Sequence, residues 1–575
     1  MLSIDDRTVM AELLFPHIGT SESEGDTDYY EKKYPPRELP VGAAVTRLGP
    51  SPTGFIHLGN LYTAFMNEKL ANETGGVCYL RIEDTDSKRE VEGAVESLIA
   101  SLSHFGVGFD EGVALTDAGD IVESGAYGPY YQSERVIIYQ TYARKLVLNG
   151  LAYPCFFTES EINALREEQE GRRETPGVYG TYAKYRDISP EEAQSRVKRG
   201  ERYVLRVDAD AMAASAPDAG DAQAEIIDGI RGKLSFPRNI MDVVVLKSDG
   251  VPTYHFAHVI DDHLMRTTHV IRGEEWISSL PIHAALFGAL GFEPPIYCHS
   301  TVLMKRDDGK KRKLSKRKDP ELSLEYYRSE GYHPKAILEY LLTIINSNFE
   351  EWRAAHPEAP IDNFEMTPEK MGVSGILFDL DKLRDVSKEV LARMPAGEIA
   401  DFVLKWSAMY DHRAHEAMVG DKQRLDAIID IGRTGEKPRK DLAYAKQIWD
   451  FISYFYDEFY EVTDPWPDNV SDEDARNILT AYTDGYDHTD DRNEWFGKIR
   501  DIATSLGYAA KPKDFKKEPD KYKGHVGDVS AVIRISVVGR AMSPDLYEIQ
   551  QILGEDKTRS RIQRCLSSIA SSPAT

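Results

Sequence analysis

The sequence predicts an α/β protein in which a parallel-sheet domain is interrupted by an insertion and followed by an all-helical C-terminal region. Three observations predict this architecture. A strand, a Gly- and Pro-rich turn, a helix and a second strand follow one another over residues 41–82. Strand-like sequence returns at 243–246 and 268–276, after a charged stretch. From about Ser323 onward, apolar residues recur mainly at helical spacing.

The first half of the sheet follows an N-terminal extension. Residues 20–40 mix acidic residues with Ser, Gly and Pro, which predicts a flexible lead-in rather than core. The apolar run at 41–48 predicts the first strand, and residues 57–71 predict a helix that ends at Gly75. A second strand at 77–82 completes a βαβ unit, which is half of a nucleotide-binding fold.

The remaining segments differ in composition, which sets the predicted boundaries. Ser133 begins a helix closed by Gly150, and the charged, Pro- and Gly-containing segment that follows is interpreted as an insertion. The predicted parts are an extension at 1–40, the two halves of the sheet domain at 41–150 and 239–320, an insertion at 151–238, a connecting region at 321–400 and a helical region at 401–575.

Composition indicates a soluble globular enzyme, with 41% hydrophobic and 29% charged residues and no apolar stretch of membrane-spanning length. The acidic start lacks the features of a secretory signal, so we expect a cytoplasmic protein. A formal net charge of −25 argues against indiscriminate polyanion binding, but not against a selective nucleic-acid partner. The cysteines (Cys78, Cys155, Cys298 and Cys565) are too scattered for a disulfide scaffold or paired metal ligands.

The most informative motif is RLGPSPTGFIHLGN at 47–60, which places His57 and Asn60 where the first strand passes into a helix. Free backbone N–H groups and the positive helix end favour phosphate there. Gly59 allows close approach of a nucleotide, and His57 can donate to a developing phosphoryl charge. The alternative interpretation is that His57 is a helix-capping or structural histidine.

A second motif, KLSKR at 313–317, supplies two ammonium groups, Lys313 and Lys316, in a polar loop. They are suited to stabilise a transferring phosphoryl group and the departing pyrophosphate. The loop belongs to the clearest basic stretch of this acidic chain, at 305–318. The alternative is a solvated basic loop without a catalytic role.

In this order, HLGN and KLSKR resemble the HIGH and KMSKS signatures of class I aminoacyl-tRNA synthetases. Segments within 44–320 such as LRIEDTD, GPYYQSER and VIRGEEW resemble the glutamyl-tRNA synthetases. The similarity continues more weakly into FDLDKL and VVGRAMSPDLYEIQQILG. The resemblance implies a Rossmann-like catalytic domain with an inserted acceptor-end domain at 151–238. It further implies a stem-contact region at 321–400 and a helical anticodon-binding region of bacterial type at 401–575.

For the amino acid, the resemblance implies that Arg47 and Arg272 bind the carboxylates and Glu83 receives the α-amino group. A guanidinium can form two parallel hydrogen bonds with a carboxylate, so the arginines favour glutamate over glutamine. Further implied contacts are Ser51, Tyr254 and His258. His258 has a core histidine as its alternative. An ion pair of Arg272 with Glu274 or Glu275 is the alternative at that arginine.

The positions implied to contact ATP are His57, Gly59, Asn60, Glu275, Trp276, Leu303, Lys313 and Lys316. The resemblance places Thr85, Asp86 and Arg89 at the terminal adenosine of tRNA, although Asp84 and Asp86 can also be interpreted as a metal pair. Mg²⁺ is better placed on the ATP phosphates. Some relatives have a CxC zinc motif where this chain has Cys155 followed by Phe157, so we expect no structural zinc.

The expected function is ATP-dependent formation of glutamyl-adenylate and pyrophosphate, followed by transfer of glutamate to the terminal adenosine of tRNA(Glu). Bound tRNA is expected to organise the site, and a monomer is expected. His57, Asn60, Lys313 and Lys316 are the predicted catalytic residues. The alternatives are a glutaminyl-tRNA synthetase, a catalytically silent tRNA-binding paralogue and a small-molecule nucleotidyltransferase. Arg272 argues against the first, the intact signature motifs argue against the second, and the long helical region argues against the third. Whether tRNA(Gln) is also charged stays open.

Overall fold

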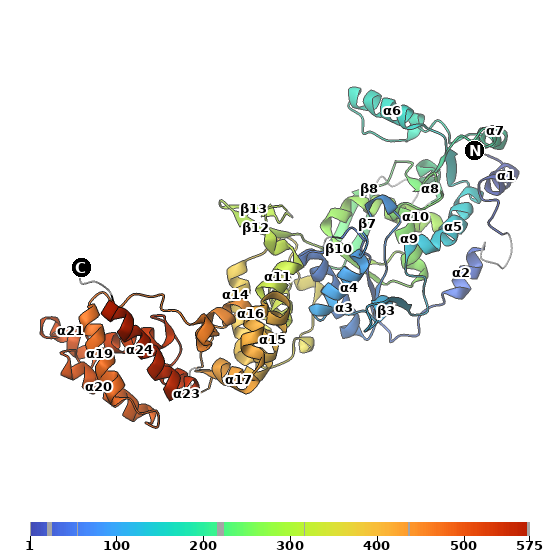
Figure 1. Ribbon diagram of the computed structural model, residues 1–575. Helices are drawn as coiled ribbons and strands as arrows, with labels where there is room; N and C mark the ends of the chain where they lie inside the picture. Colours follow the sequence, from blue (N-terminus) through green and yellow to red (C-terminus); the bar gives the residue numbers. More distant parts are fainter. Residues whose placement is uncertain are drawn as a thin grey trace. The chain divides into compact units, whose positions relative to one another are not determined.

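A computed structural model of the chain describes residues 2–19, 26–54, 56–215, 223–315, 317–434 and 438–571 (Figure 1). Two compact units divide the chain. The first consists of Met1–Leu324 with Leu338–Asp379, and the second consists of Glu325–Ile337 with Leu380–Thr575. The chain therefore passes between the units more than once, and neither unit is one continuous stretch of sequence.

The first unit is built on a parallel sheet with the strand order β1-β2-β3-β4. Strands β1 (Val45–Leu48), β2 (Val77–Leu80) and β3 (Glu111–Leu115) are parallel, and β4 (Ile121–Ser124) runs antiparallel to β3. Helices α3 (Leu58–Thr74) and α4 (Ala94–His104) connect the parallel strands. The predicted α/β fold is thus confirmed, and the predicted helix at 57–71 corresponds to α3.

Two glycines end α3 and start β2, as the sequence predicts. Gly75 adopts a left-handed conformation with φ of 66°, which a glycine tolerates at little cost. A Cβ on Gly76 would lie 1.9 Å from the carbonyl oxygen of Ala44. The close approach of the helix end to the first strand therefore depends on a residue without a side chain.

The second half of the sheet domain carries a two-stranded sheet in which β10 (His269–Gly273) and β11 (Ile296–Ser300) are parallel. Thr268 N–H donates to the carbonyl of Val45 at 3.0 Å, so β10 begins beside β1. Helices α5 (Val136–Leu148), α9 (Tyr254–Leu264) and α10 (Leu280–Leu290) also belong to this unit. The carboxyl ends of β1 and β10 consequently open toward the same region, where ligands bind in sheets of this type.

The predicted insertion contains two strands of a small antiparallel sheet and a hairpin. Strand β5 (Ala152–Cys155) pairs with β6 (Val204–Val207), and β7 (Gln223–Asp228) pairs with β8 (Gly232–Pro237). The third strand of the small sheet is β9 (Val244–Leu246), which pairs antiparallel with β6, so the expectation that residues 243–246 belong to the second half of the parallel sheet is wrong. Within its described residues, the predicted insertion also contains three α-helices, α6 (Glu159–Gly171), α7 (Pro190–Lys198) and α8 (Ala209–Ser215). After the insertion, β12 (Leu303–Asp307), β13 (Lys310–Lys313) and β14 (Ile376–Leu377) form a third small sheet that leads into KLSKR.

Helices α1 (Ile4–Leu14) and α2 (Thr27–Lys33) form the N-terminal extension. The prediction of a flexible lead-in at 20–40 is wrong for residues 26–37, and residues 20–25 lie outside the described ranges. Tyr30 and Tyr34 are buried, and the hydroxyl of Tyr34 donates to the carbonyl of Gly128 at 2.8 Å. The prediction from the polar composition gave too little weight to two tyrosines, whose rings bury a large apolar area while their hydroxyl groups form hydrogen bonds.

Arg37 fixes the end of this extension to the sheet domain. Its Nη1 and Nη2 donate to the carboxylate of Glu111 at 2.8 and 3.0 Å, and its Nε donates to the carbonyl of Met265 at 3.1 Å. The guanidinium also lies 3.8 Å from the centre of the Tyr127 ring. Residues 26–37 are therefore part of the domain they precede.

The regular elements described in the second unit are all helices, which confirms the predicted change of pattern. Its helices include α11 (Leu324–Glu330), α14 (Leu380–Arg393), α15 (Ala396–Tyr410), α16 (His412–Val419), α17 (Lys422–Asp430), α18 (Ala445–Ile452), α19 (Asp472–Gly485), α20 (Arg492–Ser505), α21 (Pro512–Lys517), α22 (Val526–Val538), α23 (Leu546–Leu553) and α24 (Glu555–Ser571). Helix α12 (Pro334–Ile345) has residues in both units, and α13 (Phe349–Ala355) belongs to the first.

Residues 325–337 are integrated into the second unit. The indole N–H of Trp406 donates to the carbonyl of Ser329, and Ala445 N–H donates to the carbonyl of Gly331, both at 2.8 Å. A Cβ on Gly331 would lie 2.5 Å from the Cβ of Ala445. This short segment thus packs as closely as a core element.

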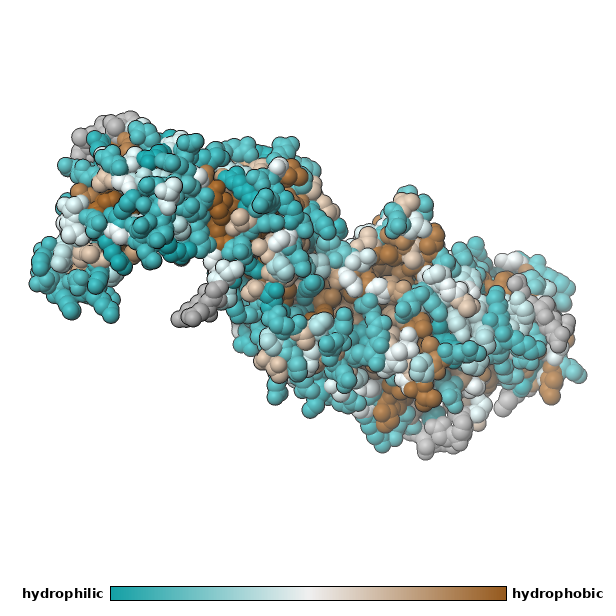
Figure 2. Space-filling model, turned by 90° about the horizontal axis from the view of Figure 1, so that it is seen from below, coloured by the Kyte–Doolittle hydropathy of each residue, from teal (hydrophilic) through white to brown (hydrophobic). Residues whose placement is uncertain are grey.

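The face seen in Figure 2 is mostly hydrophilic, as the charged composition leads one to expect. Within the described ranges, no helix combines the length and the apolar composition that crossing a bilayer requires.

Candidate active site

A cavity of about 740 Å³ opens at the ends of β1 and β10 in the first unit. This volume lies in the range of small-molecule sites. The predicted residues that line it are Arg47, Ser51, His57, Gly59, Asn60, Glu83, Thr85, Asp86, Arg89, Tyr254, Arg272, Glu275, Trp276, Leu303 and Lys313. His258 does not line it, and Lys316 lies outside the described residues. The fold thus gathers both signature motifs at one cavity, although they are far apart in the sequence.

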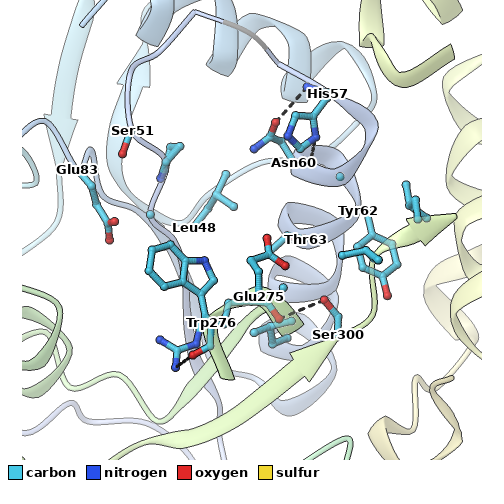
Figure 3. A pocket seen from close by; sticks show the side chains of 18 of the residues that line it. Leu48, Ser51, His57, Asn60, Tyr62, Thr63, Glu83, Glu275, Trp276 and Ser300 are labelled. Atoms are coloured by element: carbon cyan, nitrogen blue, oxygen red, sulfur yellow. Dashed lines mark hydrogen bonds between the residues drawn. The ribbon is translucent and has the colours of Figure 1, made fainter. Parts of the chain in front are cut away.

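His57 and Asn60 form a reciprocal cap at the start of α3 (Figure 3). Asn60 N–H donates to His57 Nδ1 at 3.3 Å, and His57 N–H donates to Asn60 Oδ1 at 3.0 Å. Because Nδ1 accepts, a neutral ring carries its proton on Nε2, the form that can donate to a phosphate oxygen. The capping and ligand-binding interpretations of His57 are therefore compatible with one another.

Two glycines of the first motif leave room for functional side chains. A Cβ on Gly49 would lie 2.4 Å from Oε1 of Glu83, and one on Gly59 would lie 2.9 Å from the His57 ring. Gly49 was not among the predicted site residues. Its only signal in the sequence is its place in the motif, because the clash involves Glu83, which follows β2 and is distant in the sequence.

A group of buried charges lies beneath the cavity. Arg47 Nε lies 3.3 Å from Asp262 Oδ1, and Arg81 donates to the same oxygen at 2.7 Å and to Glu83 at 2.9 Å. Sequence reasoning missed Arg81 and Asp262. Burial raises the pKa of Glu83, although Arg81 and Arg47 both favour its ionised form. Arg81 fixes the orientation of Glu83, whose carboxylate faces the cavity.

His258 lies one layer behind the cavity wall and is fully buried. Its Nδ1 lies 2.9 Å from Asp262, and its Nε2 lies 3.0 Å from the hydroxyl of Tyr297. Burial lowers its pKa to about 4, against the pull of Asp262, so the ring is neutral near pH 7. The ring of Tyr254 stacks on it at 5.7 Å. The core-histidine interpretation describes this position, and direct contact of His258 with a substrate stays a prediction.

Arg272 differs from Arg47 in its partners. Its Nε donates to His299 Nε2 at 3.0 Å, and its Nη1 lies 3.3 Å from Nδ1 of His283. Burial lowers the pKa of both histidines, so both partners are neutral near pH 7. Among the described residues, no carboxylate forms an ion pair with Arg272, which is 5% exposed.

The predicted alternative partners of Arg272 do not pair with it in the structure. Glu274 binds Nη2 of Arg231 at 2.5 Å instead. Glu275 lines the cavity beside Trp276, and a Cβ on Gly273 would lie 2.2 Å from its Oε2. Arg272 therefore presents a buried positive charge to the cavity.

The carboxylates of LRIEDTD turn to separate partners. Asp84 accepts from the backbone N–H of Ser133 at 2.8 Å, whereas Asp86 pairs with Arg89 at 2.7 Å on the surface. Among the described residues, no group of three or more His, Cys, Asp or Glu side chains is arranged to hold a metal ion. Asp84 and Asp86 thus bind different groups, and Thr85, Asp86 and Arg89 together line one edge of the cavity.

The basic loop is held by an acidic residue that sequence reasoning did not single out. Asp319 accepts from Nη1 and Nη2 of Arg312 at 2.6 and 2.8 Å and from the backbone N–H of Ser315 at 2.8 Å. The hydrogen bond from Arg312 lowers the pKa of Asp319 to about 2. Arg312 thus has a structural partner, while Lys313 lines the cavity.

Two families match the chain in regions that agree with this architecture. Residues 43–383 match "tRNA synthetases class I (E and Q), catalytic domain", and residues 439–566 match "Anticodon binding domain". Together with a parallel sheet that brings both signature motifs to one cavity, these matches define a class I tRNA synthetase of the glutamate and glutamine group.

Similar proteins narrow this class. The glutamate–tRNA ligase of Acetivibrio thermocellus is 55% identical over 98% of this chain and 100% of its own length, and that of Sorangium cellulosum is 42% identical over 93% and 97%. The crystal structure of a glutamate tRNA ligase from Elizabethkingia meningosepticum, in complex with its amino acid, matches with a TM-score of 0.71 and 26% identity over 92% of this chain and 99% of that one. The chain belongs to the glutamate–tRNA ligase family. The predicted family, enzyme class and ligation of glutamate to tRNA are thereby confirmed.

Proposed function

We propose that the cavity binds L-glutamate and ATP side by side, forms glutamyl-adenylate and pyrophosphate, and then transfers glutamate to the 3′-terminal adenosine of tRNA(Glu). One observation carries the assignment of the amino-acid site. Arg272 is a buried cation at the cavity wall whose described hydrogen-bond partners are all uncharged under neutral conditions. A ligand carboxylate would supply the missing negative charge.

The arrangement of charges supports glutamate over glutamine. Arg47 and Arg272 line one cavity with Glu83, so two cations and one anion face a ligand that carries two carboxylates and one ammonium. The uncharged amide of glutamine would leave one guanidinium without a charged partner. Ser51 and Tyr254 supply neutral contacts in the same cavity.

In the first step, the ionised α-carboxylate of glutamate attacks the α-phosphorus of ATP, and no protein base is required. His57, Asn60, Gly59, Glu275, Trp276, Leu303 and Lys313 are proposed to hold the nucleotide. The Nε2–H of His57 and the ammonium of Lys313 would stabilise charge that grows on the phosphates, and Lys316 is proposed to assist. Mg²⁺ carried on the ATP phosphates would neutralise part of that charge.

The nucleic-acid contacts are assigned by segment. Residues 151–238 are proposed to bind the acceptor end, 321–400 the stem and 401–575 the anticodon. The family match at 439–566 supports the last assignment. Thr85, Asp86 and Arg89 would meet the terminal adenosine, since they line the cavity edge. We further propose that the chain acts as a monomer in the cytoplasm, which light scattering and cell fractionation would test.

The proposal is tested by charging purified tRNA(Glu) and tRNA(Gln) with labelled glutamate and, separately, with labelled glutamine. We expect ATP-dependent glutamylation of tRNA(Glu) and no product with glutamine. Product on tRNA(Gln) as well would define a broader tRNA specificity. If neither tRNA accepts glutamate, or if glutamine is attached instead, the proposed function is wrong.

A further inference from the structure

The tip of the β7–β8 hairpin is fastened to strand β11. Gly229 N–H donates to the carbonyl of Tyr297 at 2.8 Å, and Arg231 Nε donates to the carbonyl of His299 at 2.9 Å. A Cβ on Gly229 would lie 2.6 Å from Sγ of Cys298, so this approach requires a glycine. The predicted insertion therefore reaches the strand that lies beside the one carrying Arg272.

Asp228, at the end of β7, connects the hairpin to Arg272 through one histidine. Its Oδ1 accepts the backbone N–H groups of Ile230 at 2.9 Å and Arg231 at 2.8 Å. Its Oδ2 lies 2.6 Å from Nδ1 of His299, whose Nε2 lies 3.0 Å from Nε of Arg272. Asp228 is 2% exposed and His299 is fully buried.

The hydrogen-bond donors in this series of contacts determine which nitrogen of the His299 ring carries the proton. Arg272 Nε can only donate, so His299 Nε2 must accept. A neutral ring then carries its proton on Nδ1, where it points at the carboxylate of Asp228. Burial lowers the pKa of His299, which agrees with a neutral ring. The order of donation is thus Arg272 to His299 to Asp228.

We infer that Asp228 and His299 are positioning residues that hold Arg272 in place for the carboxylate of glutamate. The inference rests on the proposed function, because it takes Arg272 as the carboxylate-binding group. Neither residue lines the cavity, so both act through the arginine. A consequence is that the predicted insertion supplies part of the support of the amino-acid site.

Asp228→Asn is a sharp perturbation because backbone contacts determine how the amide must lie. The N–H groups of Ile230 and Arg231 need an acceptor at the position of Oδ1, so the amide oxygen would lie there. The backbone N–H of His299, which donates to Oδ1 at 3.3 Å and to Oδ2 at 3.1 Å, would keep only the first of these acceptors. The amide NH₂ would then face His299 Nδ1 and force the proton onto Nε2. Two donors would oppose each other between His299 and Arg272, as in other sites where an Asp-to-Asn change imposes the wrong histidine tautomer.

The test compares steady-state charging of tRNA(Glu) at varied glutamate and at varied ATP. For Asp228→Asn we expect kcat/KM for glutamate to fall about 10- to 100-fold while KM for ATP changes less than about twofold, because one charge-assisted hydrogen bond is lost. Asp242→Asn is the matched control. Asp242 is a buried carboxylate just beyond the insertion, bound by Arg186 and Tyr153, and we expect little effect on glutamate kinetics.

A second pair of variants covers the case in which Asp228→Asn does not fold. Glutamine at position 299 can present an acceptor oxygen to Arg272, whereas leucine cannot. His299→Gln should therefore retain most of the kcat/KM for glutamate that His299→Leu loses. Equal losses in both variants, or a normal glutamate dependence in folded Asp228→Asn, would overturn the inference.

Arg272→Ala separates this inference from the function on which it rests. If Arg272→Ala lowers kcat/KM for glutamate strongly and Asp228→Asn does not, only the positioning role is wrong. If Arg272→Ala leaves glutamate kinetics unchanged, the assignment of the amino-acid site under the proposed function fails, and the positioning role fails with it.

Discussion

Gly49→Ala should damage the glutamate site while leaving the fold intact. The new Cβ would lie 2.4 Å from Oε1 of Glu83, and Cβ atoms essentially never come closer than 3.0 Å to a heavy atom of a residue that is not a chain neighbour. The carboxylate must therefore retreat by at least ~0.6 Å. This would stretch its 2.9 Å hydrogen bond from Arg81 toward the limit of such bonds. Losing a hydrogen bond to a charged group costs about 1.5–3 kcal/mol, or about 10- to 150-fold.

The assay is charging of tRNA(Glu) at varied glutamate and varied ATP. We expect kcat/KM for glutamate to fall by about two orders of magnitude. Gly288→Ala is the control, because no heavy atom lies within 4 Å of its added Cβ. In a Glu83→Gln background, Gly49→Ala should have much less additional effect, since the two changes act on one group. Additive effects, or an equal loss for ATP and glutamate, would refute the proposed displacement of Glu83.

Three further predictions follow from contacts in the first unit. Burial raises the pKa of Glu83, and its protonated form cannot attract an ammonium. KM for glutamate should therefore rise as the pH falls. Because the pKa of Glu83 is raised, this rise should begin at a higher pH than it would for an ordinary glutamate side chain. A KM that does not change with pH would contradict the prediction. Arg37→Ala leaves the partly buried Glu111 without its cation and should lower the free energy of unfolding of the first unit by about 3 kcal/mol in urea titrations; an unchanged midpoint would argue against it. Asp319→Asn should weaken the hold on Ser315 N–H and raise KM for ATP about tenfold, and an equal rise for glutamate would point to a general loss of structure.

The residues that line the cavity were largely predictable because they occur within contiguous motifs. RLGPSPTGFIHLGN and KLSKR each place several functional groups on one turn or loop, so recognising the motif locates them together. Their supports were not predictable in this way. Arg81 meets Asp262 across 181 positions, and Asp228 meets His299 across 71. Residue type indicates that a buried charge needs a partner, but only the fold determines which one.

The N-terminal segment shows a different limit of sequence reasoning. Its Ser, Pro and acidic residues led to the prediction of a flexible segment, although Tyr34 is fully buried in the domain. Helices in the second unit were easier to predict, since a long amphipathic pattern has few alternatives. Local pattern thus served well where one surface of a helix is buried, and poorly where a few aromatic residues anchor a polar segment.

The excursion of residues 325–337 into the helical unit limits how this molecule can be dissected. A fragment that starts at residue 380 would lack the carbonyls of Ser329 and Gly331, which accept hydrogen bonds from Trp406 and Ala445. It would also expose the surface on which residues 325–337 pack. A fragment that ends at residue 379 would carry those thirteen residues without the helices that enclose them. No single cleavage of the chain yields two fragments that each contain all residues of one unit. We therefore expect the catalytic and helical units to fold correctly only as parts of one continuous polypeptide.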